Sequence, residues 1–98
     1  MERYSSRTID DIGRIVIHSE LRQKLSLETG DKFSLQVVDT IVIMQRTEAE
    51  PEQGCYLSQV NELGLVELPT ELRQQMGWNV KDKIALYNTD NLIILKSA

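Results

Sequence analysis

The chain has 98 residues, 41% hydrophobic and 27% charged, a composition typical of one small globular domain. Its formal net charge of −4 argues against a protein that binds nucleic acid over its whole surface. No apolar run approaches the roughly 20 residues of a membrane span, and segment 1–10 lacks the apolar core of a secretory signal. Cys55 has no partner for an internal disulfide, so we expect a cytoplasmic protein.

The residue pattern of the first half of the chain predicts two short strands followed by a helix. A strand at 7–10 leads into a turn at 11–13, where Gly13 suits a positive φ. A strand rich in β-branched residues follows at 14–18. Ser19 is then a good N-cap for a short helix.

The rest of the first half predicts a β-hairpin. A turn at 28–31 precedes an alternating apolar pattern at 33–37, which indicates a half-buried strand. Asp39-Thr40 is expected to be a tight hairpin turn. Segment 41–44 is apolar on both faces, so we expect this strand to be covered on both sides.

The middle of the chain differs from both halves in charge. Residues 1–46 contain seven basic and seven acidic residues, residues 47–57 three glutamates, and residues 58–98 four basic and five acidic residues. The net charges of 0, −3 and −1 place the basic side chains available for phosphate mainly in the first segment. Segment 47–57 also contains Pro51 and Gly54, so we interpret it as an acidic linker.

The sequence repeats itself when it is shifted by 51 positions without a gap. Segments 7–46 and 58–97 then share ten identical residues, where unrelated chains would share about two or three. The identities are Gly13/Gly64, 20–23/71–74, 31–32/82–83, Leu35/Leu86, Asp39/Asp90 and Ile43/Ile94. Because chance seldom preserves register over such a length, we interpret the chain as copy 1 (residues 1–46) and copy 2 (residues 58–98).

Copy 2 predicts the same elements as copy 1. Thr70 is the expected N-cap of its helix, and Gly77 is expected to end that helix in a left-handed conformation. Trp78 follows the helix and is expected in the core. A unit of about 40 residues rarely buries enough apolar surface alone, so two ββαββ units should pair. The sequence leaves open whether the copies pair within one chain or between chains.

Segment 7–17 (RTIDDIGRIVI), followed by Ser19-Glu20-Leu21-Arg22, resembles the AbrB/MazE/SpoVT-type swapped-hairpin domain. Segment 60–73 resembles it too, and the tandem arrangement is similar to the MraZ branch, whose acid-to-arginine motif matches Asp10-x-x-x-Arg14. Copy 2 lacks that motif, because Asn61 and Leu65 stand at the matching positions. The resemblance covers most of the chain.

The resemblance implies a mainly β fold with two short helices, in which two swapped-hairpin units form a pseudo-symmetric β-barrel. It also implies a sequence-specific, DNA-binding transcription regulator of bacterial type, associated with the nucleoid and forming homo-oligomers. Copy 1 would read double-stranded DNA, and copy 2 would be a degenerate structural partner. The implied DNA contacts are Arg7, Arg14, Arg22 and Lys24, with Arg73 and His18 as further candidates.

The residues themselves support this interpretation and leave alternatives. Guanidinium forks match phosphate oxygens and guanine edges, although each arginine could instead be solvated beside an acidic neighbour. Asp10, Asp11 and Gly13 are expected to shape the turn, and Asp10 to orient Arg14, rather than form a metal or acid/base pair. His18 is expected at the helix entry, with a DNA contact as the alternative.

We expect no enzymatic activity, no cofactor, no metal and no small-molecule ligand, because no nucleophile–base pair, phosphate loop or ligand cluster is visible. The alternative function is an antitoxin-like module that binds a toxin partner. Cys55 is expected to be an exposed thiol without a role, or else a site of oxidative cross-linking.

Overall fold

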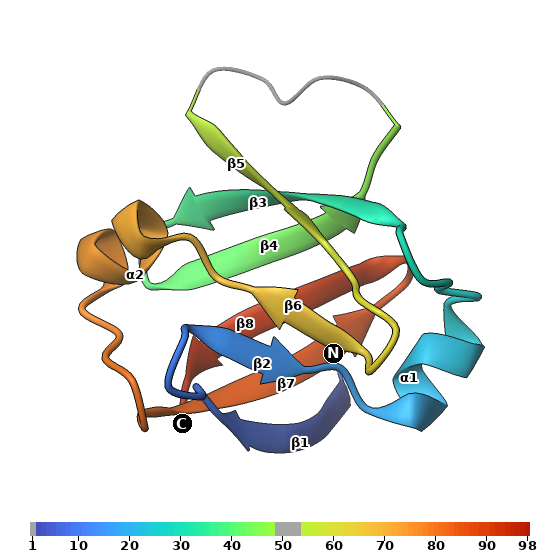
Figure 1. The fold of residues 1–98 in the computed structure, drawn as a ribbon, viewed down its shortest axis with the longest axis horizontal. Helices are drawn as coiled ribbons and strands as arrows, with labels where there is room; N and C mark the ends of the chain where they lie inside the picture. Colours follow the sequence, from blue (N-terminus) through green and yellow to red (C-terminus); the bar gives the residue numbers. More distant parts are fainter. Residues whose placement is uncertain (1, 49–53) are drawn as a thin grey trace.

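The computed structural model describes residues 2–48 and 54–98, with side chains for residues 5–48 and 54–98. The fold is mainly β with two short helices (Figure 1). Copy 1 contributes β1 (Glu2–Thr8), β2 (Arg14–Val16), α1 (Ser19–Lys24), β3 (Lys32–Val38) and β4 (Ile41–Arg46). The second half contributes β5 (Cys55–Gln59), β6 (Leu65–Glu67), α2 (Thr70–Met76), β7 (Lys83–Thr89) and β8 (Leu92–Ser97). β5 therefore includes residues 55–57, which the sequence had assigned to the linker.

The predicted element order is confirmed, but the predicted N-caps are wrong by one residue. His18 caps α1, and its Nδ1 accepts a hydrogen bond of 3.1 Å from the Glu20 backbone N–H. Pro69 takes the same place in α2 without a side-chain bond. The reason is that His18 and Pro69 are the last extended residues, with ψ near 140°, so the helices already include Ser19 and Thr70. Gly77 ends α2 at a φ of 72°, as predicted.

The two copies pair within one chain by exchanging strands. β1 of copy 1 pairs with β7 of copy 2, and β5 pairs with β3. β4 and β8 join the two halves at the centre of the sheet, and β2 pairs with β6 in a separate two-stranded ribbon. Each half therefore completes the sheet of the other, which answers the pairing question that the sequence left open.

The strands form a six-stranded sheet in the order β1-β7-β8-β4-β3-β5, and this sheet does not close into a barrel. β2 and β6 are only three residues long, and they pair with each other instead of joining the edges of the large sheet. Apart from the isolated bridge Val60–Val66, no ladder in the described chain connects the ribbon to the sheet. The expected closed barrel is thus not confirmed.

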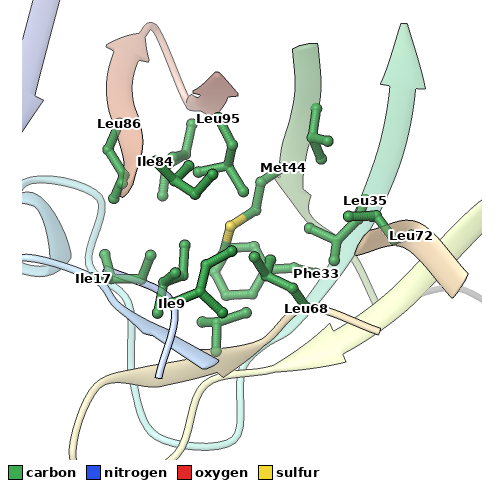
Figure 2. Close-up of a cluster of buried hydrophobic side chains, with 14 of the residues drawn as sticks. Ile9, Ile17, Phe33, Leu35, Met44, Leu68, Leu72, Ile84, Leu86 and Leu95 are labelled. Atoms are coloured by element: carbon green, nitrogen blue, oxygen red, sulfur yellow. The ribbon is translucent and has the colours of Figure 1, made fainter. Parts of the chain in front are cut away.

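The core lies between the inner face of the large sheet and the β2–β6 ribbon (Figure 2). Ile15 of β2 and Val66 of β6 are fully buried against it. Trp78 is 4% exposed and donates from Nε1 to Ser97 Oγ at 3.0 Å, which confirms its predicted core position. The expectation that β4 is covered on both sides is wrong for the single chain, because Ile41 and Ile43 on its outer face are only half-buried.

Candidate nucleic-acid interface

The turn that precedes β2 is organised by Asp10. Its Oδ1 accepts hydrogen bonds from the backbone N–H groups of Ile12 at 3.1 Å and Arg14 at 2.8 Å. Gly13 adopts a φ of 84°, which the turn requires and which a side chain would strain. We call residues 10–14 the first turn. The predicted role of Asp10 in shaping this turn is confirmed.

The second oxygen of Asp10 holds the arginine. Asp10 Oδ2 accepts from Arg14 Nε at 2.8 Å, and both side chains are about one-third exposed. Burial alone would raise the pKa of Asp10, but the hydrogen bonds from Arg14 and Ile12 keep that pKa below its usual value. Because the ion pair uses Nε, the planar guanidinium is oriented without using its terminal nitrogens.

Acid should weaken this ion pair selectively. A carboxyl whose folded-state pKa is lowered stabilises the fold above its usual pKa of 3.8 and loses that effect as pH falls through the lowered value. Asp10→Asn keeps an oxygen for the turn but removes the charge. We expect the thermal midpoint of wild type to fall more steeply than that of the variant between about pH 5 and pH 2. Parallel midpoint-against-pH curves would contradict a stabilising ion pair.

Copy 2 keeps the turn and loses the arginine. Asn61 Oδ1 accepts from the backbone N–H groups of Leu63 and Leu65, both at 2.9 Å, at the positions that match Ile12 and Arg14. We call residues 61–65 the second turn. The same backbone geometry is therefore built twice, but only the first turn carries a guanidinium at its end.

The helix arginines of both copies lie against the turns of the opposite copies. Arg22 Nε donates to the Ile17 carbonyl at 3.0 Å, and Arg73 Nε donates to the Leu68 carbonyl at 3.0 Å. A methyl group added at Gly13 would lie 2.7 Å from Arg73 Cζ. One added at Gly64 would lie 2.8 Å from Arg22 Cζ. These contacts give both arginines a structural role that the sequence did not predict.

Of the remaining candidates, His18 and Lys24 lie at the start and the end of α1, away from Arg14. Arg7 lies in β1 opposite Ile84, and its Nε is buried without a hydrogen-bond partner in the described structure. Lys24 ends α1, and His18 Nδ1 is occupied by the helix cap. Because Ile17 N–H donates to Gly64, α1 follows β2 toward the second turn and away from Arg14. The exchange of strands therefore separates Arg22 from Arg14.

The exchange also brings a cation to the first turn that sequence reasoning missed. Lys81 Nζ lies 2.7 Å from Asp11 Oδ1, and both groups are exposed. The hydrogen bond and charge of Asp11 raise the pKa of Lys81. Arg14, Arg73 and Lys81 thus surround the first turn with two carboxylates, Asp10 and Asp11. No pattern near residue 81 predicts this contact, because it depends on the pairing of β1 with β7.

The described residues, 2–48 and 54–98, contain neither a cluster of metal ligands nor a helix that could span a membrane. No group of three or more histidine, cysteine, aspartate or glutamate side chains could hold a metal ion there. No helix in these ranges is long and apolar enough to cross a membrane.

Comparisons with known proteins concern the fold. No family model matches the chain, and no curated protein is significantly similar to it. The chain is similar to the solution structure of PHS018 from Pyrococcus horikoshii, with a TM-score of 0.57 and 25% sequence identity. The match covers 97% of this chain and 87% of that one. Because the name PHS018 states no activity, the comparison supports a shared arrangement of strands and helices and nothing about function.

Proposed function

We propose that this chain is a transcriptional regulator that binds sequence-specific sites on double-stranded DNA through copy 1. The observation that carries the proposal is the Asp10–Arg14 pair at 2.8 Å on a turn fixed by backbone hydrogen bonds. A guanidinium held in one orientation loses little freedom when it meets a phosphate or the edge of a guanine. An arginine oriented in this way is better suited to contact DNA than one that is only solvated, so the geometry favours the DNA-binding interpretation of Arg14.

Of the other basic residues, Arg73 lies beside the first turn with Arg14, whereas Arg22 lies at the second turn and would contact a separate part of the duplex. Arg7 remains a candidate through its terminal nitrogens only, because its Nε is buried and out of reach of a ligand in solvent. Arg22 and Arg73 already use Nε for backbone carbonyls, so we assign them first to the fold and second to DNA through their terminal nitrogens. Lys24 and His18 remain candidates at the end and the start of α1.

The difference between the copies provides the decisive experiment. Arg14→Ala should weaken binding to a target duplex by about 10- to 100-fold at fixed salt, the loss expected for one bidentate arginine. Leu65→Ala changes the matching position of copy 2 and should leave the affinity unchanged. Fluorescence anisotropy across a salt series measures both variants and estimates the number of phosphate contacts from the slope.

The target must first be identified, for which genome-wide capture of bound DNA is the direct route. If Arg14→Ala binds the captured sites as tightly as wild type at the same salt, the proposed role of copy 1 is wrong. One chain offers about four basic contacts, which gives only modest affinity. We therefore expect the DNA-bound form to contain more than one chain.

A protein partner is the second candidate, because each turn exposes an apolar side chain. Ile12 is 62% exposed and Leu63 is 70% exposed, at matching positions of the two copies. Rigid apolar tips of this kind are common in protein contacts. Purification of the tagged chain with a stoichiometric small partner, lost on Ile12→Ser with Leu63→Ser, would favour this candidate over DNA.

A further inference from the structure

The four central strands of the large sheet carry apolar side chains on the face that points away from the core. Residues on β3, β4, β7 and β8 alternate, and most of the inward apolar ones belong to the core cluster. The outward apolar ones, which define the outer face, are Val38, Ile41, Ile43, Ala85, Tyr87, Leu92 and Ile94. An antiparallel sheet with one face in water normally places polar residues outward, so this pattern points to a covering layer.

The outer-face residues form one continuous patch. Ile43 and Ile94 are direct cross-strand partners at the centre of the sheet, and they match each other in the repeat. Ile94 is also paired with Tyr87, and Val38 with Ile41. Val38 is 37% exposed, and Ile41, Ile43, Tyr87 and Leu92 are only half-buried. Ile94 at the centre is only 5% exposed and the outward Ala85 only 2%, so the solvent contact of this patch lies at the residues that surround its centre.

We propose that a second copy of this chain stacks its outer face on this one, sheet against sheet, to form a two-fold dimer. The proposal stands apart from DNA binding. Ile15 and Val66 attach the β2–β6 ribbon to the inner face of the sheet, so the stacking would leave the first turn free.

Charge favours a second copy as the occupant. The outward positions of these four strands carry three lysines, Lys32, Lys83 and Lys96, and no acidic residue. Lys32 begins β3 and Lys83 begins β7, while the hairpins after these strands contain Asp39 and Asp90. If the two-fold axis lies parallel to the stacked sheets and perpendicular to their strands, each strand lies against the same strand of the partner running in the opposite direction. The end of β3 that carries Lys32 then faces the partner's hairpin at Asp39, and the end of β7 that carries Lys83 faces the partner's hairpin at Asp90.

Size also permits such a dimer. A stable interface buries about 800 Å² on each partner, which is roughly one-seventh of the 5938 Å² that this chain exposes. The molecule measures 30 × 29 × 26 Å, so a single broad face supplies an area of this order. Stacked sheets pack about 10 Å apart with interdigitated side chains, which suits the branched residues at the centre.

The test is the oligomeric state of the full chain without DNA. Sedimentation equilibrium across a concentration series should show a reversible dimer for wild type. Val38→Lys combined with Ile41→Lys should raise its dissociation constant at least about tenfold, because each change puts a charge into an apolar contact. Leu63→Lys makes the same chemical change at an exposed turn and should leave the dimer intact. Melting curves establish that each variant is folded.

A charge test supplies a second variant in case the double lysine chain does not fold. Asp39→Asn with Asp90→Asn removes two exposed hairpin charges, keeps side chains that tolerate the positive φ of both positions, and should also weaken the dimer. A wild-type chain that remains a monomer at several hundred micromolar would overturn the proposal. So would a dimer that both folded variants retain, because its interface would lie elsewhere.

Discussion

Separated at the linker, each half of the chain should lose its cooperative fold and regain it when the two halves are mixed. Half 1–48 contains β1, whose sheet partner β7 lies in the other half, and half 54–98 contains β5, whose partner is β3. The ribbon pair β2–β6 is also divided between them. We expect no thermal transition by circular dichroism for either purified half, and a transition for the equimolar mixture.

A protease site inserted into segment 49–53 provides the control. The cut chain should stay folded and migrate as one species, because its strands remain paired, and should separate only in denaturant. A purified half that melts cooperatively as a monomer would contradict this prediction, since it would show that one copy can bury its own core.

The order of the elements could be predicted from the sequence because it depends on local signals. Gly13 and Gly77 mark positive φ angles, and both are found there. The ten identities of the repeat also indicated two similar units. The strand exchange could not be read in the same way, because β1–β7 pairing joins residues about 80 positions apart. The repeat and the hydrophobic periodicity predict which segments are strands. Which strands pair with each other depends on the packing of the whole core.

The same distinction applies to the candidate site. The Asp10–Arg14 ion pair was predictable because the two residues are four apart on one turn. The contact of Arg73 with Gly13 was not, because it crosses from one copy to the other. Identity of Arg22 and Arg73 in the repeat could be read as a retained DNA contact, but their matching bonds to Ile17 and Leu68 give a structural reason for it. Sequence similarity alone does not separate these two reasons.

Gly13→Ala should destabilise the chain by about 2–4 kcal/mol, through backbone strain and through displacement of Arg73. Gly13 has a φ of 84°, and the added methyl would meet the Arg73 guanidinium at 2.7 Å. That guanidinium cannot move freely, because its Nε bonds to the Leu68 carbonyl. The expected fall in melting temperature is roughly 8–20 °C for a domain of this size.

Gly30→Ala isolates the backbone part of this effect. Gly30 has a φ of 91° and no atom within 4 Å of an added methyl, and Lys81 occupies the matching position of copy 2 at a φ of 79° with a full side chain. The control should therefore destabilise the chain by only about 1 kcal/mol.

Adding Arg73→Ala to Gly13→Ala should recover part of the excess loss of stability, with a coupling of about 1–2 kcal/mol in the double-mutant cycle. Equal losses for the two glycine variants and no coupling would mean that Gly13 is needed for its φ alone. The contact between the copies would then contribute nothing measurable to the fold.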